Sequence, residues 1–358
     1  MTFAPVIDLV YTWVDGRDVQ HSEQRTRYLR NKDVDTGAKG GNRFRSNGEI
    51  YASIRSANRF APWIRTIWVV VADSQLQRFN RKCIGAGSQK IRLVPHSRIF
   101  KDMTEHLPTF NSHAIESHIG GIPGLAELFM YANDDMFFGA PCKWTQFFTK
   151  TGTKWVPRIL FSGTQLQTTT NERTPLHIYS RVNNSLLLNR IQGHPSARYA
   201  ISHQLRPLCR SIYREAWRHP LLRPALLRTS ASRFRSRSDV EPVGLLLHWA
   251  YHKRRAKLST GITSLYVSIK DHTHLGELAT KLRTGRYHLY CLNDEMLKPP
   301  RHKGQQFVEF LKSALPSSGR IRTEMSVPIK KQRDVATHTS SKLTLEQLTE
   351  IKGVPESL

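Results

Sequence analysis

The chain has 358 residues, of which 39% are apolar and 9% aromatic, so we expect one large or two medium folded domains. Its 54 lysines and arginines outnumber 28 acidic residues and give a net charge of +26. Such a charge gives information about partners rather than about the fold. Nucleic acid, an anionic membrane surface or an anionic substrate could each explain it.

The four cysteines lie far apart and form no C-x-x-C pair, so neither a zinc site nor a thioredoxin-like motif is indicated. The first ten residues, MTFAPVIDLV, lack a basic region followed by an apolar stretch, so we expect no signal peptide. No run approaches the roughly 18 apolar residues that a spanning helix needs. We therefore expect a cytoplasmic protein with reduced thiols, free or bound to the inner face of the membrane.

Short segments rich in Val, Ile and aromatic residues predict strands at residues 7–13, 67–71, 91–94 and 128–131. Helical stretches lie between them. Asn47 is a candidate N-cap for a helix that runs to about Phe60, and a second helix is predicted over residues 112–119. Strands that alternate with helices predict an α/β fold with a mostly parallel, Rossmann-like sheet flanked by helices.

Each predicted strand is followed by polar residues. Because ligands bind at the carboxyl edge of strands in open α/β sheets, these strand ends predict one cleft. The adjacent carboxylates of Asp134 and Asp135 repel each other unless a cation lies between them. The alternative is that Asp and Asn are common in turns. The polar strand ends are Asp15-Gly16, Asp73, His96 and Asn133-Asp134-Asp135.

After residue 150 the pattern loosens, and we expect a more helical, basic C-terminal half. Arginines recur every four residues over 206–218, which predicts a basic stripe along one side of a helix. A solvated basic face is the plain alternative; an anionic acceptor or the membrane surface would use the same stripe. The four are Arg206, Arg210, Arg214 and Arg218. The polar tail is predicted to end in a short amphipathic helix that contains Leu345, Leu348 and Ile351.

Several of these segments resemble the Stealth proteins. IDLVYTWVDG (7–16) is similar to the first Stealth block, and FRSNGEIYASIRS (44–56) and LPTFNSHAIESHIGGIPGLAELFMYANDDMFFG (107–139) are similar to the second. The third block is represented by SHQLRPL (202–208) and SRFRSRSDV (232–240), and the fourth by YCLNDE (290–295). The family includes bacterial capsule polymerases and the eukaryotic enzyme that begins the mannose-6-phosphate tag.

The resemblance implies transfer of a hexose-1-phosphate, or its N-acetylhexosamine equivalent, from a UDP-sugar to a sugar hydroxyl, with release of UMP. Capsular or other cell-surface polysaccharide synthesis is the implied setting, and a GT-A-like sheet is the implied fold. Residues 1–310 would form the catalytic region, with a nucleotide-sugar core over 1–150 and an acceptor part over 151–310. Residues 311–358 would be a linker and the short helix.

Phosphoryl transfer requires positioning, charge neutralisation and a base. Asp134 and Asp135 are predicted to hold Mg²⁺ or Mn²⁺, because these ions prefer carboxylate oxygen and share their coordination with phosphate. Asp15 would join them or orient the nucleotide, and Gly16 would let backbone approach a phosphate. His203 is the predicted base from its place in the third block. His194 remains an alternative, because the family's His is followed closely by Pro.

The remaining candidates are assigned by block. Glu116 is a second candidate base, and it shares a predicted helix face with His113. Asn111 is expected either to hydrogen-bond the sugar or to cap that helix. Candidate phosphate-binding and catalytic residues from the blocks are Arg45, Asn47, Arg233, Arg235, Asn293 and Asp294.

Two rival functions stay open. A GT-A-like glycosyltransferase, in which the acceptor attacks the anomeric carbon and UDP leaves, would use the same acidic pair. Nucleic-acid binding would use the charge, but no reading motif accompanies it, so we expect no nucleic-acid partner. We expect a nucleotide-sugar donor and an anionic oligo- or polysaccharide acceptor instead.

Overall fold

The computed structural model describes residues 4–30, 34–40, 44–270, 275–295 and 309–311, and everything below concerns these residues. The predicted C-terminal helix and most of the predicted linker lie outside them. The helices are α1 (Val19–Arg30), α2 (Glu49–Phe60), α3 (His96–Ile99), α4 (Ser112–His118), α5 (Leu176–Gln192), α6 (Arg210–Ala216), α7 (Leu222–Ala231), α8 (Pro242–His252) and α9 (Leu275–Arg283).

The central sheet has five strands in the order β10-β4-β1-β2-β3. Strands β4, β1, β2 and β3 are parallel, and β10 at the edge is antiparallel to β4. Strands β1 and β4 are almost wholly buried, which explains their nearly continuous apolar sequences. The strands of this sheet are β1 (Ile7–Thr12), β2 (Ile64–Val71), β3 (Ile91–Pro95), β4 (Leu128–Asn133) and β10 (Arg206–Cys209).

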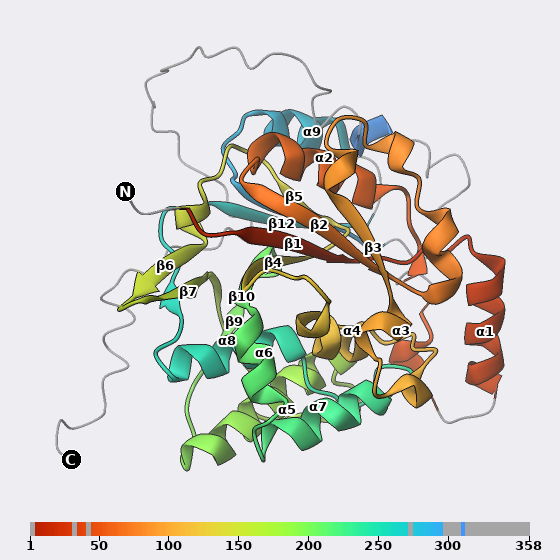
Figure 1. Cartoon of the computed structure of the whole chain (residues 1–358). Coiled ribbons are helices and arrows are strands. Elements are labelled where there is room, and N and C mark those ends of the chain that lie inside the picture. The colour runs from red at the N-terminus through yellow and green to blue at the C-terminus, as the bar shows by residue number, and fades with distance from the viewer. Residues whose placement is uncertain (1–3, 31–33, 41–43, 271–274, 296–308, 312–358) are drawn as a thin grey trace.

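Helices cover both faces of this sheet. Figure 1 shows α2 and α9 on one side and α4 to α8 on the other. The α/β architecture with a mostly parallel sheet is therefore confirmed, as are the four predicted strands and the predicted helix that becomes α4.

A second sheet, β12-β13-β5, continues from the first. Strand β5 follows β4 after a two-residue turn, but it pairs with β13 rather than with the central sheet. The other strands are β5 (Met136–Phe138), β6 (Phe148–Thr151), β7 (Lys154–Ile159), β8 (Phe161–Gln165), β9 (Tyr199–Ile201), β11 (Lys257–Leu258), β12 (Ser264–Ile269) and β13 (Leu289–Asp294).

The basic stripe predicted over 206–218 is wrong. Arg206 begins strand β10, and Pro207 is tolerated there because β10 is an edge strand. The helix α6 starts only at Arg210, whose guanidinium donates to the carbonyls of Gly120 and Leu125. Arg206 itself is buried, so the four arginines form no common surface.

The predicted cap of α2 is also wrong. The helix begins at Glu49, and its N-cap residue is Gly48, with a left-handed φ of 90°. Asn47 lies one residue further out, where its amide is bonded to carboxylates rather than to the helix end. In the described residues, no helix is both long enough and apolar enough to cross a membrane.

Candidate functional site

The acidic pair lies in the turn that joins the two sheets. Asp134 and Asp135 connect β4 to β5, and β5 is paired with β13. The Leu292 N–H donates to the Asp135 carbonyl at 2.9 Å, and the Cys291 thiol donates to Asp135 Oδ2 at 3.4 Å. Strand β13 therefore fixes the turn at the carboxyl edge of the central sheet.

Three carboxyl groups gather here without an ion-pair partner among the described residues: Glu49, Asp134 and Asp135. Burial raises the pKa of Asp135 to about 6, and the charge of Glu49 adds to the effect. Burial, Glu49 and Asp135 raise the pKa of Asp134 well above its usual range. Within the described part of the chain, Asp135 Oδ1 is buried and has no hydrogen-bond partner. Neighbouring carboxyl groups of this kind are stabilised in their charged forms by a cation between them.

The segment before α2 and the end of β13 complete this edge. Arg45 Nε lies 3.2 Å from Asp294 Oδ2. The Asn47 amide donates to Glu49 Oε1 at 2.9 Å and to Asp294 Oδ2 at 3.3 Å. Three predicted phosphate-binding residues thus lie beside the carboxylate cluster: Arg45 and Asn47, and Asp294, which is distant from them in the sequence.

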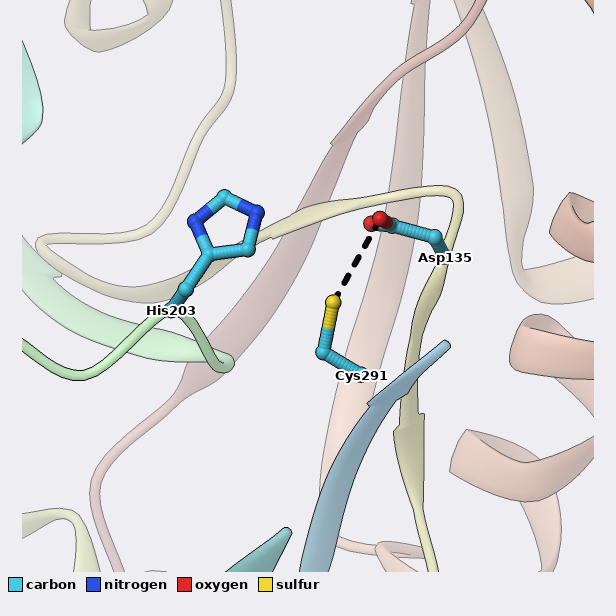
Figure 2. Close-up of side chains that lie close together, drawn as sticks. All are labelled: Asp135, His203 and Cys291. Carbon is cyan, nitrogen blue, oxygen red and sulfur yellow. Dashed lines mark hydrogen bonds between the residues drawn. The ribbon is translucent and has the colours of Figure 1, made fainter. Parts of the chain in front are cut away.

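Asp135, His203 and Cys291 resemble a metal site, because their ligand atoms lie within 4.8 Å of one another (Figure 2). The bonding of His203 argues against it. Arg206 Nη2 lies 3.2 Å from His203 Nδ1, and a guanidinium can only donate. Nδ1 therefore accepts, and the proton of the neutral ring is on Nε2, whereas a metal needs a bare nitrogen there.

The Cys291 thiol is equally unsuited to a hard cation such as Mg²⁺, which takes oxygen ligands, whereas thiolate sulfur selects softer metals. The carboxylates of Asp134 and Asp135, with the charge of Glu49 acting on both, offer the oxygen ligands that a hard divalent cation prefers, although in the described residues only Asp135, His203 and Cys291 have ligand atoms within 4.8 Å of one another. The orphaned Asp135 Oδ1 and the mutually raised carboxyl pKa values are the observations that support this fit.

His203 contacts Arg206, which belongs to a network of ion pairs with Glu241 and Arg181. Arg206 Nη1 lies 3.3 Å from Glu241 Oε1, and Arg181 Nε lies 3.3 Å from Glu241 Oε2. Although burial opposes it, the charges of Arg206 and Arg181 lower the pKa of Glu241 to about 2. Burial and the charge of Arg206 lower the pKa of His203 to about 3, so the imidazole stays neutral.

This geometry favours a role for His203 other than that of the predicted base. With its proton on Nε2, the ring presents a hydrogen-bond donor toward the site and has no lone pair there to take a proton. His203 can therefore stabilise negative charge, but it is not a base in this tautomer. The alternative candidate, His194, is exposed near the end of α5, with Nδ1 3.1 Å from the Pro195 carbonyl oxygen.

Glu116 has the properties expected of a base. It is buried on α4, and the Tyr131 hydroxyl donates to its Oε1 at 3.1 Å. The other oxygen, Oε2, is buried and has no hydrogen-bond partner among the described residues. Burial, helped by the charge of Glu241, raises the pKa of Glu116 to about 7, although Arg206 and Arg235 oppose the shift. His113 is buried on the same helix, as predicted.

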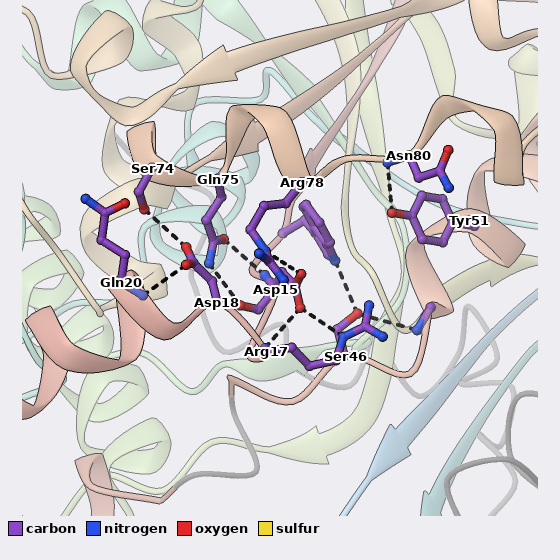
Figure 3. A network of polar contacts seen from close by, with 12 residues as sticks. Asp15, Arg17, Asp18, Gln20, Ser46, Tyr51, Ser74, Gln75, Arg78 and Asn80 are labelled. Carbon is purple, nitrogen blue, oxygen red and sulfur yellow. Dashed lines mark hydrogen bonds and ion pairs between the residues drawn. The ribbon is translucent and has the colours of Figure 1, made fainter.

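Asp15 is bonded differently (Figure 3). Arg78 Nε donates to Oδ2 at 2.7 Å, and the Arg17 backbone N–H donates to Oδ1 at 3.0 Å. Burial raises the pKa of Asp15, but these hydrogen bonds outweigh it and the net pKa is lowered. Gln75 also fixes both backbone groups of Asp15. Because its oxygens already have cationic partners, Asp15 does not fit as a ligand of the same metal.

The structure gives a packing reason for glycine at position 16. A Cβ at this position would lie 1.7 Å from the Phe44 carbonyl oxygen. Glycine is required because the backbone around Phe44 packs against it, and the phosphate-binding role predicted for Gly16 stays a prediction.

Other predicted residues hold loops together. Arg233 donates to the carbonyls of Glu105, His106 and Pro108, so its guanidinium is committed to backbone. Arg235 donates to Ser112 Oγ at 2.7 Å, and its charge acts on the buried acids Glu116 and Glu241. Of the two arginines predicted from this block, Arg235 is the one associated with the acidic groups.

The other two predicted asparagines, Asn111 and Asn293, also have hydrogen-bond partners. Asn111 Oδ1 accepts from the His113 N–H at 3.1 Å, which confirms the helix-cap alternative. Its amide nitrogen donates to Asp239 Oδ2 at 2.8 Å and joins α4 to the segment before α8. Asn293 donates to the Tyr266 hydroxyl at 2.8 Å.

Several residues of the site were not predicted. Arg206 was assigned to a surface stripe, and Arg181, Glu241, Arg78 and Cys291 were not singled out. Glu241 precedes Pro242, the first residue of α8. A proline there indicates where a helix begins and says nothing of an ionic network. Its burial between two arginines arises from packing of distant elements, which no local pattern reveals.

Comparison with known proteins gives a consistent family. Residues 5–33 match the family model "Stealth protein CR1, conserved region 1", and residues 43–156 match "Stealth protein CR2, conserved region 2". The exopolysaccharide phosphotransferase CpsY of Mycobacterium leprae is 34% identical over 315 residues, covering 87% of this chain and 56% of the relative. The exopolysaccharide phosphotransferase SCO6021 of Streptomyces coelicolor is 34% identical over 311 residues, covering 84% and 53%.

The chain spans about half the length of the curated relatives it matches. Among solved structures, the galactosyltransferase LgtC aligns with a TM-score of 0.42 and 10% identity, covering 87% of this chain and 97% of that one. A likeness this weak identifies neither substrate nor mechanism.

Proposed function

Because the chain belongs to the Stealth family, we propose that it transfers a hexose-1-phosphate or N-acetylhexosamine-1-phosphate from a UDP-sugar to a sugar hydroxyl, forming a phosphodiester in cell-surface polysaccharide synthesis. The names of the exopolysaccharide phosphotransferase relatives support this reaction class. The observation that carries the proposal is the group of Glu49, Asp134 and Asp135 at the carboxyl edge of the sheet, where the carboxyl pKa values of Asp134 and Asp135 are raised and Asp135 Oδ1 has no hydrogen-bond partner among the described residues.

Asp134 and Asp135, with Glu49 beside them, would hold Mg²⁺ or Mn²⁺, and the ion would supply charge neutralisation for the donor diphosphate. The acceptor oxygen forms a bond to the β-phosphorus, and the bond from that phosphorus to the bridging oxygen breaks. UMP leaves with the bonding electron pair. The proton of the acceptor hydroxyl goes to Glu116, whose raised pKa and unpartnered Oε2 suit a general base.

His203 and the arginines stabilise charge in this scheme. The Nε2–H of His203 donates to an oxygen of the migrating phosphoryl group, as a neutral imidazole can. Arg206 keeps the proton on Nε2 by donating to Nδ1. Arg235 balances the negative charge that Glu116 carries before it receives the proton.

The setting follows from the substrates. The free state of all four cysteines fits the reducing cytoplasm, where the donor would be available, and contact with the inner face of the membrane is part of this proposal. We expect the acceptor to be an anionic saccharide, since the chain carries a net charge of +26.

The test is incubation with a panel of UDP-sugars and saccharide acceptors in Mg²⁺ or Mn²⁺, with the released nucleotide identified by chromatography. UMP is expected. Release of UDP would indicate attack at the anomeric carbon and the glycosyltransferase alternative. In the same assay, EDTA is expected to abolish nucleotide release, and added Mg²⁺ is expected to restore it.

A further inference from the structure

A small basic pocket lies beside the carboxylate cluster. It has a volume of about 170 Å³ and is formed by the loop after β1, the first half of α1 and the segment before α2. Three arginines line it, Arg17, Arg25 and Arg45, and none of its described lining residues is acidic. His21 adds no charge at neutral pH, because burial lowers its pKa.

Arg25 is the unusual member of this pocket. Its guanidinium carbon lies 4.4 Å from the centroid of the Phe44 ring, which holds the group against an apolar surface. Its Nη1 is buried and has no hydrogen-bond acceptor in the described residues. The structure records no carboxylate within ion-pair distance of Arg25 among those residues, whereas Arg65, Arg181 and Arg206 each have one.

A guanidinium in this state is costly for the folded protein. A buried donor without an acceptor costs roughly 1–3 kcal/mol, and more when it is charged. Burial lowers the pKa of Arg25, yet a guanidinium keeps its charge at any ordinary pH. A ligand that brings oxygen acceptors and negative charge would remove this cost.

The size and surroundings of the pocket indicate which ligand. Its volume of about 170 Å³ is below the roughly 300 Å³ at which pockets for drug-sized ligands begin, so a phosphate group matches it better than a whole nucleotide sugar. Arginine forks match the oxygens of phosphate in pairs. Arg45 pairs with Asp294, which also accepts from Asn47 beside Glu49, so the pocket adjoins the carboxylate cluster.

We propose that this pocket binds a phosphate group of a substrate, that Arg25 is its principal ligand, and that Arg17 and Arg45 border it. The choice of substrate rests on the proposed function. The group is either a phosphate of the UDP-sugar donor or a phosphodiester of a growing anionic acceptor. Binding of phosphate itself requires no turnover.

The first test measures binding of inorganic phosphate by ³¹P NMR titration at low ionic strength in EDTA, which keeps the carboxylate cluster free of metal. Arg25→Gln is expected to weaken binding about tenfold relative to the wild type. Arg27→Gln, which removes an exposed arginine of the same helix outside the pocket, is the matched control and should change affinity less than twofold. Equal affinities for the two variants would overturn the proposal.

A folding control accompanies this test, because Arg25 also packs on Phe44. Circular dichroism and thermal melting show whether Arg25→Gln remains folded. If it does not, Arg25→Lys carries the test, because it keeps the charge but lacks the fork, and it should bind phosphate several-fold more weakly than the wild type. Unchanged phosphate binding by folded Arg25→Lys and salt-independent binding by the wild type would together refute the site.

The second test identifies the source of the phosphate. If the donor supplies it, UDP will displace inorganic phosphate from the wild-type protein, and Arg25→Gln will weaken UDP binding about tenfold. If the acceptor supplies it, phosphate and UDP will bind together, and Arg25→Gln will leave UDP binding unchanged. If the wild-type protein binds no phosphate in either case, the proposed phosphate site is refuted. The proposed reaction is not, because the UMP assay tests it separately.

Discussion

Two aspartates, the buried Asp8 in the central sheet and the half-buried Asp135 in the turn that follows it, have opposite surroundings. Asp8, within β1, is fully buried, and four donors satisfy its carboxylate: two from Arg65, the Trp68 indole and the Ala126 N–H. Asp135 lies at the other edge of the sheet, after β4, with one orphaned oxygen and like charges beside it. A satisfied buried carboxylate stabilises the fold, whereas an unsatisfied one is kept for a ligand.

The largest effect is expected at Asp135. Asp135→Asn removes a charge that the substrate and metal require, so turnover should fall about 10³-fold or more. The variant should melt at or above the wild-type temperature, because it relieves repulsion with Glu49 and Asp134. Nucleotide release and thermal melting measure these two results. A large fall in melting temperature would show that Asp135, like Asp8, stabilises the fold.

Asp8→Asn should behave in the opposite way. It removes the ion-pair partner of Arg65 and disturbs an acceptor for two other groups, the Trp68 indole and the Ala126 N–H, so the free energy of unfolding should fall by about 3 kcal/mol. Denaturant titration measures this change. Turnover per folded molecule should stay close to that of the wild type, and a selective loss of kcat would contradict the contrast.

The pH dependence of kcat and of stability tests whether Glu116 is the base. If it is the base, kcat should fall as pH drops below about 7, because protonated Glu116 cannot accept a proton. Glu116→Gln should lower kcat about hundredfold and remove this acidic limb. Since the folded pKa is raised, the stability contributed by protonated Glu116 is present at low pH and lost as pH rises through 7. The wild type should therefore lose more stability between pH 6 and 8 than Glu116→Gln does.

Metal binding gives the smallest effect. Mg²⁺ at 100 times its Kd should stabilise the wild type by about 2.7 kcal/mol, seen as a rise of several degrees in melting temperature. Asp134→Asn should lose most of this rise, and His203→Gln should keep it, because His203 does not fit as a ligand. Loss of the rise in His203→Gln, with retention in Asp134→Asn, would assign the metal to the Asp135–His203–Cys291 group instead.

Much of the sheet was predictable because buried parallel strands carry near-continuous apolar residues, and their polar ends identified Asp134 and Asp135. Arg206 was misplaced because a four-residue spacing of arginines suggests a helix, while Arg206 in fact begins an edge strand. The network around His203 could not be predicted, because Arg206 and Glu241 meet only through tertiary packing. The tautomer of His203, and with it the change from base to donor, depends on that contact.

The most direct measurement follows the β-phosphorus. A UDP-sugar labelled at the β-phosphate is incubated with the protein, an acceptor and Mg²⁺, and the products are separated. Recovery of the label in a phosphodiester on the acceptor, with unlabelled UMP released, is the expected result. Recovery of the label in released UDP, with a phosphate-free glycosidic product, would contradict phosphoryl transfer at the Asp134–Asp135 edge.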